Sequence, residues 1–433
     1  MTAAFRITVA GRWLAHDYGD ATERATLGQL EIFAADRCLT LLQDREAGAL
    51  RSFASLSAHD LAFWLAANWW RLRWEPERTG TDWAMSHRIA AIGRGYVWPN
   101  ITVLSDGEQI TVQARPTAGA AWEPIRYLEN WDAVIAAAAF EAGVAAFVDE
   151  VLGRLAACRV QGSELSELWA ELRRERRDAE VASLRRLEAL AGYDAGEAPG
   201  KLIEALRARA ATDGPGAVDE IAAGFGGEAV SAADTIDRAL GAHGIECRGD
   251  SIGKLAQARR RWQDAGAPHE RAAAAAHLAR HLWSFGDAAP IPDKALAEIV
   301  GADPKLLSEA GDIPIAAARR GNGARAPWRA LLRSRYPEGR RFELCRLIGD
   351  AADATGEDRL LPATAAKTSR QKFQRAFAQE FLCPVRALIE TLGTSHPEDD
   401  EIEAAAAHFQ VSPLLVRTTL VNHKIVPRDE LAM

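Results

Sequence analysis

The hydrophobic pattern of this chain changes character after about residue 128, and that change limits the folds open to it. Before this point, residues 5–14, 30–44 and 101–116 have the composition and alternation of strands. From Asn130 onward, long Ala-rich runs favour helices, because Ala loses no side-chain entropy in a helix. We therefore predict a mixed, mostly α fold with an N-terminal α+β domain followed by helical domains.

The length of 433 residues predicts more than one domain, since single hydrophobic cores rarely grow past about 250–300 residues. We expect an α+β Trp-rich domain over residues 1–129, a helical middle region over 130–267 and a third region over 268–433. In the first domain, Ser105-Asp106-Gly107 predicts a hairpin turn, and Ser57 with Asp60 resembles a helix-opening capping box. In the middle region, residues 131–158 are predicted to form a helix.

Cysteine content and the N-terminal segment point to a cytoplasmic protein. The five cysteines contain no CxxC pair and are odd in number, as expected for free thiols in a reducing compartment. The first 20 residues lack a charged segment followed by a long apolar one, and no apolar run approaches a membrane span. We therefore expect no membrane association.

The charge of the chain is unevenly distributed. The formal net charge is -8, which argues against a protein that coats nucleic acid generally. Residues 315–386, however, contain 15 Lys and Arg against seven Asp and Glu. This basic stretch predicts either an anionic partner surface or pairing with the acidic remainder of the chain.

A sequence motif that bears on function lies in residues 340–350, RRFELCRLIGD. This stretch is similar to the RRFTLAHELGH helix of the ImmA/IrrE family of zinc metallopeptidases. In that pattern two His four residues apart bind zinc from one helix face, and the Glu activates the metal-bound water. Here Arg346 stands at the first His, Leu347 at the catalytic Glu and Asp350 at the second His.

Two further segments extend the resemblance, which covers residues 331–426. Residues 374–384, QRAFAQEFLCP, look like the family's EANxFAxELLMP helix, and residues 406–412 resemble its AxxFxVS segment. The family's third zinc ligand is a Glu just before the AN pair, and Phe373 or a neighbour stands there. The resemblance implies an α+β pseudo-metallopeptidase module without catalytic residues, metal or cofactor.

What the resemblance implies about function is limited to a class. ImmA/IrrE-like proteins are associated with bacterial mobile elements, stress responses and phage-linked loci. A pseudoenzyme of this type implies a non-catalytic regulatory or binding protein with a protein or nucleic-acid partner. The oligomeric state does not follow from the sequence.

An enzyme with non-zinc chemistry is an alternative. It would use charged side chains near the former metal site, and these should then converge in a pocket. The candidates are Glu343, Arg346, Asp350, Lys367, Arg370 and Lys372. A separate pair, His277 and His281, has the spacing of metal ligands but no Glu between them and no evident third ligand.

A DNA-binding transcriptional regulator is the other alternative, because the C-terminal segment has helix-turn-helix spacing. Residues 402–409 predict one helix, residues 410–412 the turn, and Ser412 with Pro413 the start of a second helix. The second helix would present Leu414 to the groove together with the candidate nucleic-acid contacts. These contacts are Arg417, Thr418, Asn422, His423 and Lys424.

Tryptophans and arginines interleave in residues 68–76, NWWRLRWEP, within the helix expected from Ser57 to before Pro76. With downstream residues they are a candidate recognition surface for a base or nucleotide. The alternative is that the same aromatic residues anchor a core between helix and sheet. The candidate surface consists of Trp70, Arg71, Trp74, His87 and Trp98.

Overall fold

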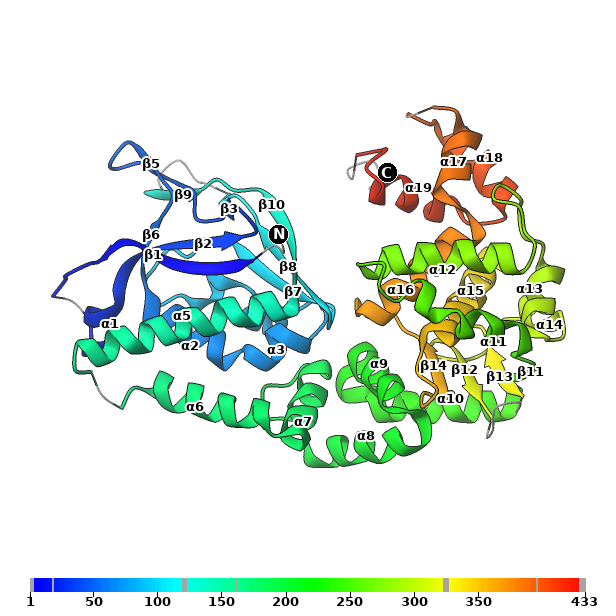
Figure 1. Ribbon diagram of the computed structural model, residues 1–433, viewed down its shortest axis with the longest axis horizontal. Helices are drawn as coiled ribbons and strands as arrows, with labels where there is room; N and C mark the ends of the chain where they lie inside the picture. Colours follow the sequence, from blue (N-terminus) through cyan, green and yellow to red (C-terminus); the bar gives the residue numbers. More distant parts are fainter. Residues whose placement is uncertain are drawn as a thin grey trace. The chain divides into compact units, whose positions relative to one another are not determined.

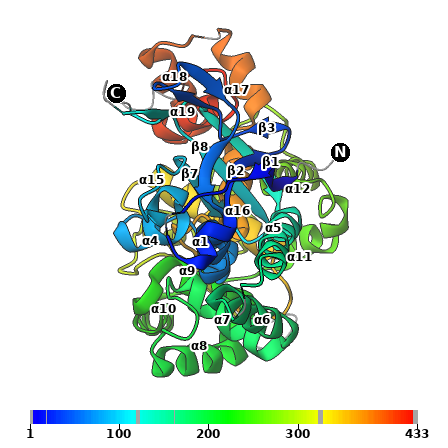
Figure 2. The same ribbon diagram turned by 90° about the vertical axis from the view of Figure 1, so that its left-hand side faces the viewer.

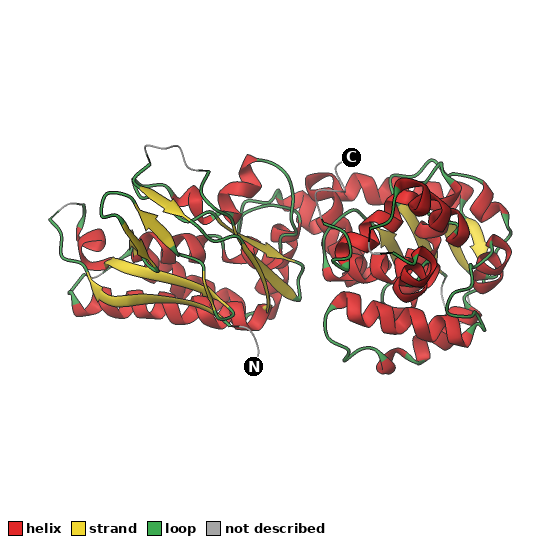
Figure 3. Ribbon diagram, turned by 90° about the horizontal axis from the view of Figure 1, so that it is seen from above, coloured by secondary structure: helices red, strands yellow, loops and turns green. Residues whose placement is uncertain are grey.

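Two separate hydrophobic clusters organise the chain, one built from residues 5–189 and the other from residues 247–426. The computed structural model describes residues 4–427 except 18, 119–122, 161, 322–326 and 395. The chain divides into two units, Met1–Ile203 and Glu204–Met433. As predicted, the fold is mixed α/β, with a β-rich N-terminal region followed by helical segments (Figure 3).

The first unit places short antiparallel sheets against helices. Its strands are β1 (Phe5–Trp13), β2 (Leu27–Ala34), β3 (Arg37–Cys38), β4 (Leu42–Asp44), β5 (Ala49–Arg51), β6 (Ala54–Ser57), β7 (Ile101–Ser105), β8 (Gln109–Ala114), β9 (Ile125–Tyr127) and β10 (Trp131–Ala136). Its helices are α1 (Ala21–Thr26), α2 (Ala58–Ala67), α3 (Trp69–Trp74), α4 (Thr81–His87), α5 (Ala137–Ala157), α6 (Glu164–Arg177) and α7 (Ala179–Leu190), with a 3-10 turn η1 (Ile89–Ile92). Helix α5 runs along β1, with α2 beside it (Figure 1).

Local signals in this unit match the structure. The hairpin predicted at Ser105 joins β7 to β8, which pair in antiparallel register. The Ser57 side chain accepts a hydrogen bond from the backbone N–H of Asp60 at 3.2 Å, so it caps α2 as expected. The expected single helix is divided at Asn68 into α2 and α3.

The helix predicted from Trp131 was wrong over its first six residues. Trp131–Ala136 is strand β10, which pairs with β8 from Ala114 to Gln109, and the helix begins only at Ala137. An unpaired backbone edge on β8 stabilises the strand there, which local Ala-rich propensity does not reveal. The predicted boundary after residue 129 therefore falls inside the first unit.

The second unit contains one antiparallel sheet in the order β11-β13-β12-β14. Its strands are β11 (Ile245–Cys247), β12 (Ala316–Arg320), β13 (Trp328–Leu331) and β14 (Leu360–Ala363). Its helices are α9 (Pro215–Phe225), α10 (Ala229–His243), α11 (Asp250–Gln257), α12 (Pro268–Leu282), α13 (Asp293–Val300), α14 (Lys305–Ser308), α15 (Pro337–Asp353), α16 (Ser369–Leu382), α17 (Val385–Leu392), α18 (Asp399–Phe409) and α19 (Pro413–Asn422), with turns η2 (Gly226–Glu228) and η3 (Arg259–Arg261). Helix α8 (Gly200–Asp213) crosses the division between the units.

The sequence-based division between residues 267 and 268 also differs from that of the structure. Strand β11, from the expected helical middle region, pairs with β13 from Ile245 to Cys247. Helices α9 and α10 contact the strands of the same sheet. Long-range strand pairing thus joins the second half of the middle region to the C-terminal unit.

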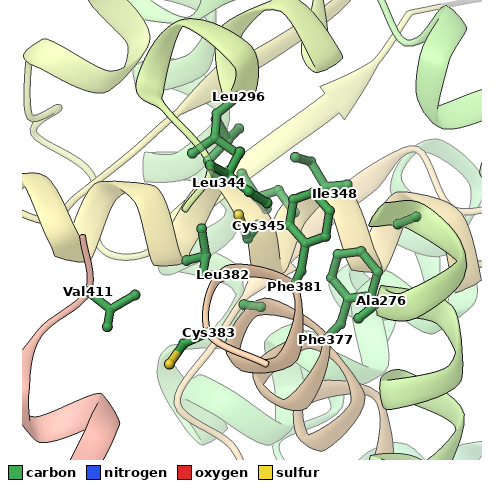
Figure 4. Close-up of a cluster of buried hydrophobic side chains, with 14 of the residues drawn as sticks. Ala276, Leu296, Leu344, Cys345, Ile348, Phe377, Phe381, Leu382, Cys383 and Val411 are labelled. Atoms are coloured by element: carbon green, nitrogen blue, oxygen red, sulfur yellow. The ribbon is translucent and has the colours of Figure 1, made fainter. Parts of the chain in front are cut away.

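The C-terminal core is centred on α15, α16 and α12. Side chains such as Leu344, Ile348, Phe377 and Phe381 meet there, as Figure 4 shows. Gly349 permits a close approach of α15 to α16, because a Cβ at this position would lie 2.7 Å from the Phe377 ring. This crossing fixes which polar side chains of the two helices face each other.

Candidate functional site

A buried polar cluster occupies the region where α15 faces α16. Arg346 and Asp350 lie four residues apart on α15, so they share one helical face. Their partners come from α16 and the segment that leads to it, and both side chains are buried. This is the helix that the sequence resemblance placed at a metal site.

Arg346 is held by uncharged acceptors. Its Nη2 donates to the Thr364 carbonyl at 2.6 Å, to Gln371 Oε1 at 2.5 Å and to Gln374 Oε1 at 3.3 Å. Its Nε is buried without a hydrogen-bond partner among the described residues. Burial, with repulsion from Arg375, lowers the pKa of Arg346 to about 10.

Asp350 forms the centre of an ion-pair network with Arg370. Arg370 donates from Nε and Nη2 to the two Asp350 oxygens at 2.7 and 2.9 Å, and from Nη1 to Asp358 at 2.7 Å. Burial alone would lower the pKa of Arg370, but Asp350 and Asp358 raise it. Both oxygens of Asp350 are therefore engaged by a guanidinium in a bidentate arrangement.

The two other positions that the resemblance aligned with metal-site residues lie in the hydrophobic core. Leu347 is buried in the C-terminal cluster. Phe373 stacks on Phe377 with ring centroids 6.3 Å apart and belongs to the same hydrophobic cluster. Gln371 and Gln374, one helical turn apart, are the α16 residues whose side chains accept hydrogen bonds from Arg346, and Gln374 is the immediate neighbour of Phe373.

The cluster does not fit a zinc ion. Zinc requires three or four neutral or anionic donors, whereas the first position carries a guanidinium and the second a carboxylate bound to another guanidinium. Across the part of the chain that the structure describes, no three His, Cys, Asp or Glu side chains are grouped to hold a metal.

One member of the cluster has no sequence signal. Glu220, on α9, lies in the segment expected to be a helical middle region, yet its Oε2 accepts a hydrogen bond from the Thr368 hydroxyl at 2.8 Å. No motif links positions 148 residues apart. Two glycines of α9, Gly216 and Gly224, leave room for a close approach of this helix to neighbouring residues. They are the sequence feature that could have indicated the contact.

Of the six residues proposed for non-zinc chemistry, three meet in the buried cluster and two, Glu343 and Lys367, have other surroundings. Arg346, Asp350 and Arg370 belong to the buried cluster, while Glu343 accepts hydrogen bonds from the backbone N–H groups of Arg333 and Ser334. Lys367 is exposed. The geometry therefore gives no support to an enzyme built from this set.

Acidic residues from elsewhere in the second unit compensate part of the charge of the basic stretch, residues 315–386. Arg319 pairs with Asp213 and Asp237, and Arg341 pairs with Asp293. Further arginines donate to backbone carbonyls at helix and loop ends. These are Arg320, Arg340 and Arg375. The intramolecular interpretation of this charge excess is thus favoured over an anionic partner surface.

The C-terminal helix-turn-helix geometry follows the sequence closely. Helix α18 ends at Phe409, Gln410 adopts the left-handed conformation, and the Ser412 side chain accepts from Leu415 N at 3.2 Å. Helices α17, α18 and α19 gather near the C-terminus in both views (Figures 1 and 2). The predicted elements are therefore present.

The candidate nucleic-acid contacts on α19 are unequally available. Asn422, His423 and Lys424 are exposed at the end of the helix. Arg417 is paired with Asp399 at 2.6 Å, and the Thr418 hydroxyl donates to the Leu414 carbonyl at 2.7 Å. A nucleic-acid phosphate would have to compete with Asp399 for Arg417.

The candidate recognition surface of the N-terminal unit is largely core. Trp70, Arg71, His87 and Trp98 are buried, and only Trp74 is partly exposed. Helix α3 packs on α7 and β7, which covers this face of the aromatic run. Tertiary packing therefore overturns the surface interpretation and favours the core one.

Polar atoms of this buried group have internal partners. Trp70 Nε1 donates to Glu175 at 2.9 Å, and Arg71 donates to Glu75 at 2.6 Å. The His87 ring nitrogens lie 2.9 Å from the Val103 carbonyl and 3.0 Å from Glu75. Burial opposes ionisation of Glu75, but its bonds with His87 and Arg71 lower its pKa overall.

His277 and His281 do not converge on a shared metal site. His277 Nε2 lies 3.2 Å from Glu380, and this contact raises its pKa despite partial burial. His281 is exposed. Glu380 also accepts from Val385 N at 3.3 Å, so it caps the start of α17.

Two surface hollows lie apart from the buried cluster. One, of about 450 Å³, is lined by His423 and apolar residues of α17 such as Val385 and Ile389. The other, of about 720 Å³ in the first unit, contains four carboxylates at the N-termini of α1, α2 and α6, where helix dipoles favour negative charge. They are Asp20, Glu23, Asp60 and Glu164.

Comparison with known proteins adds no relative: the chain matches no family model, no curated protein and no solved structure. Of the helices that the structure describes, none has the length and apolarity needed to cross a membrane.

Proposed function

We propose that this chain is a non-catalytic regulatory or binding protein of the mobile-element, stress-response or phage-defence type, built on a degenerate metallopeptidase scaffold. One observation supports it most directly. At the two positions where the family resemblance implies His ligands, Arg346 and Asp350 are already engaged with protein partners. The helix and its facing helix persist, while the donors that zinc chemistry needs are replaced.

An Arg and an Asp at the positions of the two His ligands are unfavourable for zinc binding. An arginine side chain stays protonated and has no lone pair to give a cation. Asp350 is an oxygen donor, but a metal would have to displace Arg370 from both of its oxygens. Displacement would leave a buried guanidinium with fewer partners, which is unfavourable.

Metal content tests this proposal. We expect the purified chain, expressed with added zinc, to hold far less than one equivalent by elemental analysis. Chelation with EDTA should leave its melting temperature unchanged, because no folding free energy comes from a metal. Stoichiometric zinc that survives dialysis, or a clear drop in melting temperature with EDTA, would contradict the proposal.

A DNA-binding regulator remains a second candidate, favoured by the α18–α19 arrangement and the exposed end of α19. If α19 contacts a duplex, Lys424→Ala should weaken binding and reduce its salt dependence by about one phosphate contact. Lys254→Ala, a change of an exposed lysine on α11, is the matched control. Absence of binding at low salt to duplexes from the gene's own locus would remove this candidate.

The compartment belongs to the same proposal. All five cysteines are free, and three of them, Cys247, Cys345 and Cys383, are buried with a pKa raised by burial to about 12. Inert buried thiols suit a reducing environment. We therefore place the protein in the cytoplasm as part of the proposal.

A further inference from the structure

Helix α9 covers the polar cluster from a distant part of the chain. Glu220 of α9 accepts a hydrogen bond from the Thr368 hydroxyl, and Ala217 N donates to Asp358 Oδ1 at 3.2 Å. Thr368 is the N-cap of α16, and Asp358 is a partner of Arg370. Both α9 contacts therefore end on residues that belong to or border the cluster.

Glycines allow α9 to lie this close. A Cβ on Gly224 would stand 3.0 Å from Thr364 Cβ, and one on Gly216 would stand 2.6 Å from an Asp358 oxygen. Thr364 is the residue whose carbonyl accepts from Arg346. Two glycines of one helix thus face two residues that bind the arginines of the cluster.

The apolar side of α9 is not part of the main core. Among the described residues, the large hydrophobic cluster of the second unit starts at Cys247 and includes none of the buried side chains of α9. Those side chains, such as Val218 and Ile221, lie on the same helix as Glu220, and this helix contacts α10, η2 and β14. Helix α9 therefore borders the core of α15 and α16 through β14 and contributes no buried side chain to it.

The Glu220 carboxyl is placed among opposed charges. Arg370 and Arg375 act on it from α16, and Arg346 and Asp350 act on it from α15. Asp358, in the loop before β14, binds the same helix at Ala217 N. Burial raises the pKa of Glu220 to about 7, although Arg370 and the bonds with Thr368 and Gln371 act in the opposite direction. Its attachment is therefore sensitive to ionisation near neutrality.

We propose that α9 is a latch over the cluster of Arg346, Asp350, Arg370, Gln371 and Gln374, held closed by insertion of Glu220 beside Thr368. Release of the latch uncovers the guanidinium groups of Arg346 and Arg370. This device goes beyond the proposed function, since it concerns the position of α9 and not the absence of a metal site.

The direction of the pH effect follows from linkage. The pKa of Glu220 is raised in the closed state, so protonation of Glu220 favours closure. The free energy that protonation contributes to closure is fully present below the ordinary pKa of Glu. It is lost as the pH rises toward 7, and the opening equilibrium levels off above that pH. Between about pH 6 and about pH 8 the opening equilibrium should rise about tenfold.

Hydrogen exchange of the full-length chain, corrected for intrinsic rates, tests the latch. In the wild type, exchange over residues 215–225 and 368–372 should increase together by about tenfold from about pH 6 to about pH 8. Glu220→Gln keeps the shape and removes the ionisation, so this increase should disappear. Glu204→Gln, on the exposed side of α8, should behave as the wild type does.

Two further variants separate the latch from a general loss of stability. Thr368→Val removes the hydroxyl donor and should raise exchange over residues 215–225 at both pH values, whereas Thr368→Ser should not. Independent exchange of the two segments, or an unchanged pH effect in Glu220→Gln, would overturn the latch. Either result leaves the metal analysis unaffected, so the two proposals fail separately.

Discussion

Replacing Gly349 with Ala is expected to lower the free energy of unfolding of the C-terminal unit by about 3 kcal/mol, because it overpacks the helix crossing. The added methyl group would meet Cδ1 and Cγ of Phe377 at 2.7 Å. Phe377 has no free space to move into, since it is fully buried and stacks at 5.6 Å on Phe381. Relief therefore requires α15 and α16 to separate.

Gly253→Ala is the matched control for this change. Gly253 also lies inside a helix, α11, but a Cβ there meets nothing within 4 Å. Ala is the better helix former, so this variant should be more stable by about 0.5–1 kcal/mol. Denaturant unfolding, monitored by far-UV circular dichroism, measures the free energy of unfolding of both variants. Equal stability of the two variants would refute the close α15–α16 packing.

Asp350→Asn is expected to lower the free energy of unfolding by about 3–5 kcal/mol. This is the loss expected when one partner of a buried ion pair is removed. The variant keeps the size of the side chain but takes the negative charge from the bidentate contact with Arg370. Asp358 stays as the second partner, so the loss should fall near the lower end of this range.

An exposed ion pair on α17 provides the comparison. Glu390→Gln breaks the pair with Arg386, whose two side chains are solvent-exposed at i, i+4 spacing. We therefore expect the free energy of unfolding to fall by less than about 0.5 kcal/mol. Both variants are measured by the same denaturant titration. If Asp350→Asn proves as mild as Glu390→Gln, the cluster is not a buried network and Asp350 is free to take another ligand.

Elements whose signals are local could be predicted from the sequence. Ser412 followed by Pro413 defines the start of α19 through a side-chain cap and a fixed φ, which require only neighbouring residues. The same holds for Ser57 at α2 and for the turn after Ser105. The four-residue spacing of Arg346 and Asp350 placed them on one face of α15 for the same reason.

Features that depend on distant partners could not be predicted. Trp131–Ala136 becomes a strand because β8 offers an unpaired edge, and the aromatic run around Trp70 becomes core because α7 and β7 cover it. Glu220 enters the polar cluster only because α9 packs beside β14. None of these contacts leaves a pattern within a window of neighbouring residues.

By itself the sequence determined the mixed α/β class, the start of the main helices and the absence of His and Glu at positions 346, 347 and 350. These follow from side-chain identity, capping and periodicity, which act over a few residues. Only the tertiary structure decided the division after Ile203, the partners of Arg346 and Asp350, and the position of α9 over them. Those depend on burial and charge pairing between segments far apart in the chain, where packing free energy outweighs local preference.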